Sequence, residues 1–305
     1  MFVWSSIGCL SVSQLVPPTV DEDPSLPSEA LAGTSLRVER WGSPDDPLVV
    51  LLHGGPGADF DGLARLAPLA DDGFQVLAFD QRGAGRSRRH DPGSVSVDRL
   101  VDDVAELVER HSPDGSVILV GHSWGGMLAA ATIGAYPELS DRVVLLDPGP
   151  FDGERWKSLG LTRIDLSAEP LNDLFWSEQM VSPDGHARLD WHFQQLVAGQ
   201  TPAYRMSTDD PMPFRRYGRV SYDDVMASAQ DADGEPAWDF AAGVADWPGT
   251  AHFVWGGANE IMDPAYRAAQ EADWPHTTTT TIDGVGHDLP WVAADAVLAH
   301  LREVL

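Results

Sequence analysis

A serine stands between glycines in the segment Gly121-His122-Ser123-Trp124-Gly125. This G-x-S-x-G spacing is typical of a nucleophile elbow, a turn from a strand into a helix that is too tight for larger side chains. The apolar run before the segment and the apolar, alanine-rich run after it favour an elbow over a glycine-rich turn with a bystander serine. We expect Ser123 to be a nucleophile above a sheet, with a helix N-terminus beneath it that stabilises developing negative charge.

A second glycine-rich segment, His53-Gly54-Gly55-Pro56-Gly57, closes an earlier apolar run. Glycines lack Cβ atoms, so their backbone N–H groups can approach a ligand closely. We expect the N–H of Gly54 or Gly55, together with that of Trp124, to bind the oxyanion of a tetrahedral intermediate. The alternative is a strand-ending turn stiffened by Pro56.

Apolar runs that alternate with helical patterns must position these segments. The run Pro47–His53 has no polar alternation, which is typical of a strand buried on both faces. Similar runs span residues 75–80, 116–121, 142–147 and 250–255, a weaker one spans 277–282, and residues 36–41 suggest a short edge strand. Because helical spacing such as that of Val97–His111 lies between most of them, the sequence predicts an α/β fold with a mainly parallel sheet.

Two regions depart from this alternation. Residues 1–33 become rich in proline, serine and acidic residues from position 17, so we expect a flexible or surface-lying extension. Residues 151–246 lack long apolar strand runs but contain many aromatic residues, which predicts an inserted, mostly helical cap over the carboxyl edge of the sheet. The catalytic α/β domain then comprises residues 34–150 and 247–305.

Charge and composition exclude several classes of partner. The 305 residues include 47 acidic and 20 basic ones, a net charge of −27 that repels nucleic acid and anionic lipid. Cys9 is the only cysteine and no cluster has metal-ligand spacing, so we expect no disulfide, no metal and no cofactor. The apolar N-terminal stretch is too short and polar to span a membrane. We expect a cytoplasmic protein, with export or lipidation at Cys9 as the alternative. The sequence does not show which oligomeric state the protein has.

The sequence resembles the proline iminopeptidase-like branch of the α/β-hydrolase superfamily. The resemblance lies in the order and spacing of three motifs, at His53–Gly57, Asp80–Ser87 and Gly121–Gly126. The resemblance is strong over residues 45–150 and covers 247–305 in outline. It implies an α/β-hydrolase fold and a serine aminopeptidase that releases N-terminal proline, or another small residue, from short peptides or amides. The cap carries little of the resemblance, so an esterase or lactonase acting on a small-molecule acyl substrate remains the alternative.

The resemblance also implies the chain order serine, acid, histidine. Only His287 and His300 follow the last expected strand, and His287 lies in a glycine-rich loop whereas His300 lies within the terminal helix, so His287 is expected to be the base. Glu260 stands at the family's usual position for the acid and is the first candidate. Asp263, which can also be a helix cap, and Asp147, after another strand, are the alternatives.

The other polar residues near these motifs are expected to have structural roles. Arg82 and Arg86 should pair with nearby carboxylates and hold their loop against the elbow. His122 should pack on the side of the elbow opposite the nucleophile.

The resemblance places substrate-binding residues in the cap, where carboxylates hold the free amine of a peptide. Glu178 is the candidate for this contact, and Trp176 and Trp191 are candidates for lining the pocket.

Overall fold

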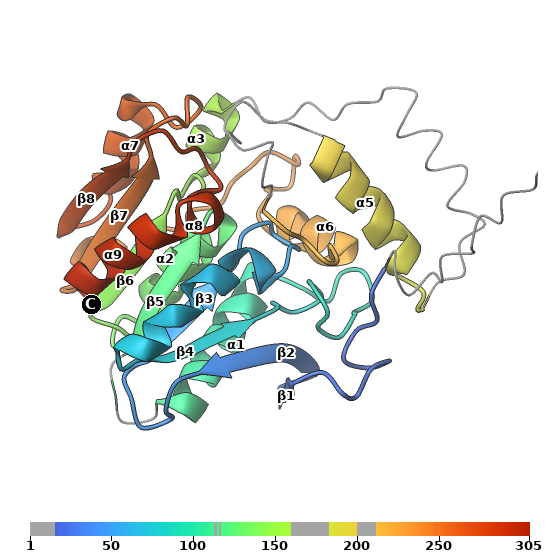
Figure 1. Ribbon diagram of the computed structural model, residues 1–305. Helices are drawn as coiled ribbons and strands as arrows, with labels where there is room; N and C mark the ends of the chain where they lie inside the picture. The colour runs from blue at the N-terminus through green and yellow to red at the C-terminus, as the bar shows by residue number, and fades with distance from the viewer. Residues whose placement is uncertain (1–15, 113–114, 116, 160–182, 200–211) are drawn as a thin grey trace, which may run out of the picture.

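The computed structural model describes residues 16–112, 115, 117–159, 183–199 and 212–305. Within them, a central sheet has eight strands in the order β1-β2-β4-β3-β5-β6-β7-β8 (Figure 1). The strands are β1 (Ser28–Leu31), β2 (Thr34–Trp41), β3 (Leu48–Leu52), β4 (Gln75–Phe79), β5 (Val117–His122), β6 (Arg142–Leu146), β7 (Thr250–Gly256) and β8 (Thr277–Ile282). β2 is antiparallel to both of its neighbours, β1 and β4, and all other neighbouring strands are parallel. The predicted α/β fold with a mainly parallel sheet is confirmed.

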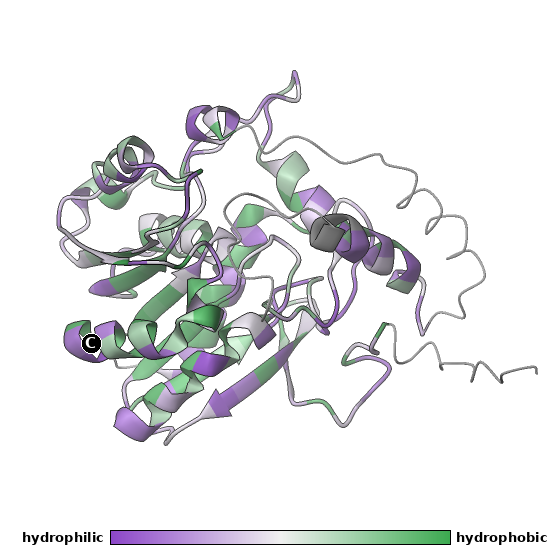
Figure 2. Ribbon diagram, turned by 45° about the horizontal axis from the view of Figure 1, so that its top comes forward, coloured by the Kyte–Doolittle hydropathy of each residue, from purple (hydrophilic) through white to green (hydrophobic). Residues whose placement is uncertain are grey.

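Burial of the strands follows their composition. Every residue of β3, β4 and β5 is buried, as runs without polar alternation predict, and the central strands are mostly green in Figure 2. β8 has the sequence TTTTTI and is largely exposed at one edge of the sheet. β1 forms the other edge, so the prediction of an edge strand at residues 36–41 is wrong in its position: this strand is β2, which lies one place inside the edge.

Helices cover both faces of this sheet (Figure 1). One face carries α1 (Val97–His111), α2 (Trp124–Ala135) and α7 (Pro264–Glu271), and the other carries η2 (Phe60–Asp72), α8 (Leu289–Val292) and α9 (Ala294–Val304). The Ser96 side chain caps α1, and its apolar residues, including Leu100 and Leu107, are buried. The helix expected at Val97–His111 is therefore confirmed.

The described residues between 151 and 246 include α3 (Gly153–Ser158), α5 (Ala187–Gly199), α6 (Arg219–Ser228) and η3 (Val244–Asp246). α5 and α6 lie beyond one end of the sheet in Figure 1. Val225 of α6 lines a pocket together with Gly55 and Trp124, which follow β3 and β5. This inserted region therefore covers the carboxyl ends of the central strands.

The segment before β2 packs against the sheet domain. Val16, Thr19 and Val20 are buried, and the Val20 N–H donates to the Arg86 carbonyl at 2.8 Å. Residues 28–31 pair with β2 as the edge strand. Of the two arrangements expected for this segment, residues 16–33 therefore show the surface-lying one, because a few apolar side chains and an unpaired sheet edge give this polar segment a place to bind.

The predicted arginine pairs in the loop after β4 are confirmed. Arg86 lies 3.4 Å from an Asp23 carboxylate oxygen. Arg82 donates from Nε to Asp103 Oδ2 on α1 at 2.9 Å, and from Nη2 to the Ala32 carbonyl at 2.9 Å. Arg82 and Asp103 are only 6% and 2% exposed, so this pair joins the loop, the N-terminal segment and α1 inside the protein.

We expect Arg82→Met to lower the free energy of unfolding by about 3–5 kcal/mol, because it leaves the Asp103 carboxylate buried without its partner. Burial already raises the pKa of Asp103 despite the opposing effect of Arg82, so protonation at lower pH should narrow the difference from the parent. Denaturant titration of both proteins at several pH values measures this. The double variant with Asp103→Leu should recover most of the loss, and a loss below 1 kcal/mol in the single variant would contradict the expectation.

Candidate active site

Ser123 stands at a sharp turn between β5 and α2. Its backbone has φ 55° and ψ −119°, a strained conformation for a residue with a side chain. A Cβ atom at Gly121 would lie 2.2 Å from the Gly125 carbonyl oxygen, and one at Gly125 would lie 2.0 Å from the Leu52 carbonyl oxygen. The glycines of the motif are thus required by close backbone approach, and the elbow geometry predicted for this segment is present.

His287 and Asp147 form a buried pair beside the elbow. His287 Nδ1 lies 3.1 Å from Asp147 Oδ2, and these residues are 7% and 0% exposed. A carboxylate only accepts hydrogen bonds, so Nδ1 carries the proton and the lone pair of the neutral ring is on Nε2. This tautomer is the one that a general base needs in order to accept a proton from a serine hydroxyl.

Asp147 is held in place by two donors from the β7 side. The Gly256 N–H donates to Oδ1 at 3.1 Å, and Asn259 Nδ2 donates to Oδ2 at 2.7 Å. The backbone of Asp147 has φ 45° immediately after β6. The Ser123 N–H donates at 3.1 Å to the carbonyl of Leu146, the residue before Asp147, so the elbow is bonded directly to the end of β6.

The prediction that Glu260 is the acid paired with His287 is wrong. Glu260 is exposed on the loop after β7, and the preceding Asn259 is the residue of this loop that contacts Asp147. Asp263 accepts from the Tyr266 N–H at 2.8 Å as the N-cap of α7, which is the structural role weighed for it. The third candidate, Asp147, is the one that the fold brings to His287.

His122 does not point away from the site as expected. It is buried, its Nε2 lies 2.8 Å from the His287 carbonyl oxygen, and the two imidazole ring centroids are 4.7 Å apart. The turn at Ser123 directs this side chain toward the loop after β8. Spacing within the motif could not reveal this contact, because His287 is 165 residues away along the chain.

The loop after β3 lies against the elbow. A Cβ atom at Gly54 would be 3.2 Å from the Ser123 Cβ, so a side chain there would crowd the serine. Gly55 has φ 132°, a value that favours glycine. Among the described residues, the backbone N–H groups of Gly54, Gly55 and Trp124 have no hydrogen-bond acceptor. This is compatible with the oxyanion donors expected from the sequence.

Side chains behind this loop fix its position. His53 Nδ1 lies 2.8 Å from the Gly54 carbonyl, and His53 Nε2 accepts from the Gln81 N–H at 3.0 Å. Gln81 also donates to the His53 carbonyl at 2.9 Å and accepts from Trp124 Nε1 at 2.9 Å. Burial lowers the pKa of His53 to about 4, so the ring is neutral at physiological pH. Gln81 thus links the β3 loop to the residue that follows Ser123.

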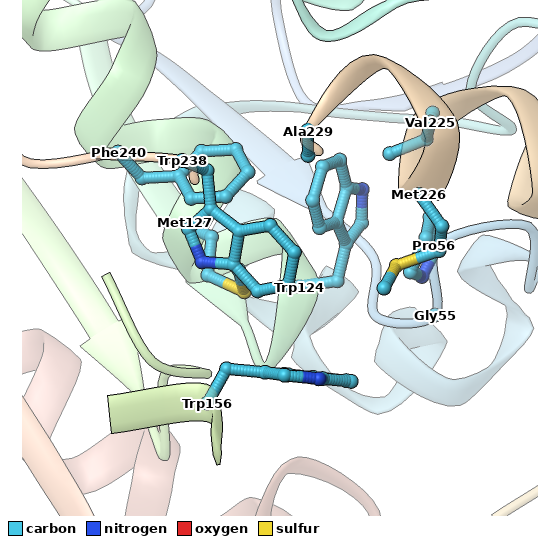
Figure 3. A pocket seen from close by; sticks show the side chains of 10 residues that line it. All are labelled: Gly55, Pro56, Trp124, Met127, Trp156, Val225, Met226, Ala229, Trp238 and Phe240. Carbon is cyan, nitrogen blue, oxygen red and sulfur yellow. The ribbon is translucent and has the colours of Figure 1, made fainter. Parts of the chain in front are cut away.

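An apolar pocket opens beside the backbone of Gly55 and Trp124 (Figure 3). Trp124, Trp238 and Trp156 surround it, and Val225, Met226 and Ala229 of α6 close one side. The remaining lining residues are Gly55, Pro56, Met127 and Phe240. None of these ten residues has a titratable side chain, so the described lining suits an uncharged, apolar group.

Of the three residues predicted for the cap, the structure describes Trp191. Trp176 and Glu178 lie outside the described residues. Trp191 is on α5 and half-buried, where its ring packs edge-on against His192 with centroids 5.1 Å apart. It is not part of the apolar pocket lining.

Among the described residues, no group of three or more His, Cys, Asp or Glu side chains could hold a metal ion. None of their helices has both the length and the apolar character needed to cross a bilayer.

Comparison with known proteins places this site in a family. Residues 47–294 match the family described as "alpha/beta hydrolase fold". The chain belongs to this α/β-hydrolase family. The match includes the β3 loop, the elbow, Asp147 and His287. The expected resemblance to the proline iminopeptidase-like branch is also confirmed, by relatives in sequence and in structure.

Relatives in sequence carry several activities in their names. A proline iminopeptidase of Saccharolobus solfataricus is 40% identical over 157 residues, which are 51% of this chain and 46% of that protein. A bifunctional esterase/perhydrolase of Acinetobacter calcoaceticus is 37% identical over 34% of this chain and 37% of its own. The α/β hydrolase superfamily protein YfhM of Bacillus subtilis is 34% identical over 38% of this chain and 40% of its own. The matched stretches thus span less than half of these relatives.

Solved structures resemble the chain over most of its length. VinJ superposes with a TM-score of 0.68 over 91% of this chain and 96% of its own, at 17% identity. Proline iminopeptidase of Mycobacterium smegmatis superposes with a TM-score of 0.64 over 92% of this chain and 97% of its own, at 18% identity. These likenesses show the shared α/β-hydrolase fold.

Proposed function

We propose that the hydrolase is serine-based, with Ser123 as nucleophile, His287 as general base and Asp147 as the acid that orients His287. The observation that carries this proposal is the buried Asp147–His287 contact of 3.1 Å beside a strained Ser123. His287 Nε2 takes the proton as Ser123 attacks a carbonyl carbon. Asp147 then stabilises the imidazolium, which returns the proton to the leaving group as the acyl-enzyme forms. A water molecule then attacks the acyl-enzyme, with His287 again as general base, and releases the carboxylic acid product and free Ser123.

The oxyanion of each tetrahedral intermediate is proposed to bind to the N–H of Trp124 and the N–H of Gly54 or Gly55. Gly54 packs against Ser123, Trp124 follows it in the chain, and the Gln81 hydrogen bonds link both segments before substrate arrives. Donors that are already oriented cost no reorganisation during reaction, which makes this kind of stabilisation a large contribution to catalysis.

For the substrate, we propose first the release of N-terminal proline, or another small apolar residue, from short peptides or amides. The pocket lined by Trp124, Trp238 and Phe240 suits a pyrrolidine ring or a similar apolar group. Its place next to Gly55 puts such a group beside the expected oxyanion donors. The 40% identity with a proline iminopeptidase over half of the chain supports this choice.

A second candidate is an esterase or lactonase acting on a small acyl substrate. It is favoured by the lining of the described pocket, which has no carboxylate that could pair with a substrate ammonium group. A desolvated cation without such a partner costs several kcal/mol. The peptidase therefore requires an anionic anchor elsewhere, and Glu178 is the proposed one.

Two classes of substrate distinguish these candidates. If the enzyme is an aminopeptidase, N-acetylation of proline naphthylamide should lower kcat/KM by about 10²-fold or more, because the anchor loses its cation. The assay compares the free and acetylated amides with small nitrophenyl esters, at high enough salt to screen the net charge of −27. Glu178→Gln should reduce kcat/KM for the free amine alone. Equal cleavage of both amides, with much faster turnover of esters, would instead support the esterase.

A further inference from the structure

His122 lies where three segments of the candidate active site meet: the elbow at Ser123, the loop after β3 and the loop that carries His287. It is covalently adjacent to Ser123, and its Nε2 lies 2.8 Å from the backbone carbonyl oxygen of His287. A Cβ atom at Gly54 would be 3.3 Å from His122 Nδ1, so the β3 loop packs directly against the ring. The side chain is 4% exposed, and the site as proposed assigns it no role.

The hydrogen bond fixes the proton of the His122 ring. A carbonyl oxygen only accepts, so His122 Nε2 must carry a hydrogen and donate it to His287. The neutral ring with hydrogen on Nε2 suffices for this contact. A neutral ring also avoids placing a second positive charge 4.7 Å from His287 when that ring becomes an imidazolium.

The loop that carries His287 connects β8 to α8. It runs from β8 through Gly284, Val285 and Gly286, two of which have no side chain to pack. The Val285 carbonyl accepts from the Ala258 N–H at 2.8 Å, which ties the loop to the segment after β7. Asp147 holds the His287 ring through Nδ1. The His122 contact links the His287 backbone to the strand that carries Ser123.

We propose that His122 is a positioning residue that sets the distance and orientation of His287 relative to Ser123. This inference rests on the proposed serine mechanism and goes beyond it by assigning a function to the residue before the nucleophile. His122 itself transfers no proton. It keeps the general base within reach of the hydroxyl, and small displacements of a base cost large factors in rate.

Three substitutions at His122 separate this role from simple packing. His122→Gln can place its amide N–H near the position of Nε2 and keep the hydrogen bond. His122→Asn has the same polarity but places its donor near the position of Nδ1, too short to reach the carbonyl. His122→Leu fills space without any donor. We expect the Gln variant to retain kcat within about 3-fold, and the Asn and Leu variants to lose about 10- to 100-fold in kcat with little change in KM.

A spectroscopic measurement reports on His287 directly. The Nδ1 proton shared with Asp147 should give a low-field proton NMR signal that is unchanged in the Gln variant and broadened or shifted in the Asn variant. Melting temperatures of the folded variants establish that the comparison is between intact proteins. If Asn and Leu variants keep the parent kcat, or the Gln variant loses as much as they do, the positioning role is overturned.

Labelling by a fluorophosphonate separates this inference from the proposed mechanism. A parent protein that is not labelled at Ser123 would overturn the serine mechanism and the inference together. If the parent is labelled and the Asn variant is labelled equally fast, only the role of His122 fails. Slower labelling of the Asn variant, with a parent-like rate for the Gln variant, supports both.

Discussion

Ser123→Ala should abolish labelling by a fluorophosphonate and lower kcat by a factor on the order of 10⁴ to 10⁶. The hydroxyl is the group that would form the acyl bond, and the methyl group of alanine has no nucleophilic atom. The N–H groups of the β3 loop and Trp124 would remain, so a small residual rate above the uncatalysed reaction is compatible with this result. Labelling followed by mass spectrometry, together with steady-state kinetics, measures both effects.

His287→Ala should have nearly the same effect, because an unactivated serine hydroxyl is a poor nucleophile. The double variant should be little worse than either single one, since the two residues act as a unit. Ser43→Ala, at an exposed serine between β2 and β3, is a matched control that should leave labelling intact. Full labelling of Ser123→Ala at another residue would refute the assignment of the nucleophile.

The sheet and the elbow could be predicted from the sequence because their signals are local. The apolar runs at residues 47–53, 75–80 and 116–121 correspond to β3, β4 and β5, whose burial on both faces leaves no position for polar alternation. The turn at Ser123 can be predicted from its motif, because Gly121 and Gly125 are required by close backbone contacts within the motif and with the adjacent strand β3. Such features depend little on how distant segments meet.

The contacts of Asp147 and His122 with His287 could not be predicted in this way. Asp147 and Glu260 both follow apolar strands, and chain order alone does not show which loop residue turns toward His287. The parallel pairing of β6 with β7 places Gly256 and Asn259 as donors to Asp147, while Glu260 extends into solvent. One signal did favour Asp147, because it ends the strand beside the one that carries Ser123.

The packing of residues 16–33 against the sheet domain could not be predicted for a different reason. Its composition indicates that residues 17–33 cannot fold alone, and this is consistent with a segment that buries only a few side chains. Composition does not show that the main domain offers an unpaired β2 edge and the carbonyl of Arg86 as partners. Tertiary contacts therefore decide the structure of a segment whose local sequence predicts none.

Asp147→Asn should lower kcat by about 10⁴-fold while leaving the fold intact. The carboxylate accepts from His287 Nδ1, and in doing so it selects the tautomer with a free lone pair on Nε2. An amide nitrogen at the same place would donate to Nδ1 instead and move the ring proton to Nε2, where it blocks proton transfer from Ser123. The amide also removes the charge that stabilises the imidazolium in the transition state.

Glu260→Gln and Asp263→Asn are the matched controls, because each also replaces a carboxylate by its amide on the adjacent loop. Glu260 is exposed and Asp263 caps α7, so both variants should keep kcat within about 3-fold, and Asp263→Asn should still cap the helix. The low-field proton signal of His287 should disappear or shift in Asp147→Asn and should stay unchanged in both control variants. A large loss of kcat in Glu260→Gln with a parent-like Asp147→Asn would mean that the loop after β7 rearranges during catalysis and brings Glu260 to His287. The buried position of Asp147, with donors from Gly256 and Asn259 on both of its oxygens, argues against that exchange.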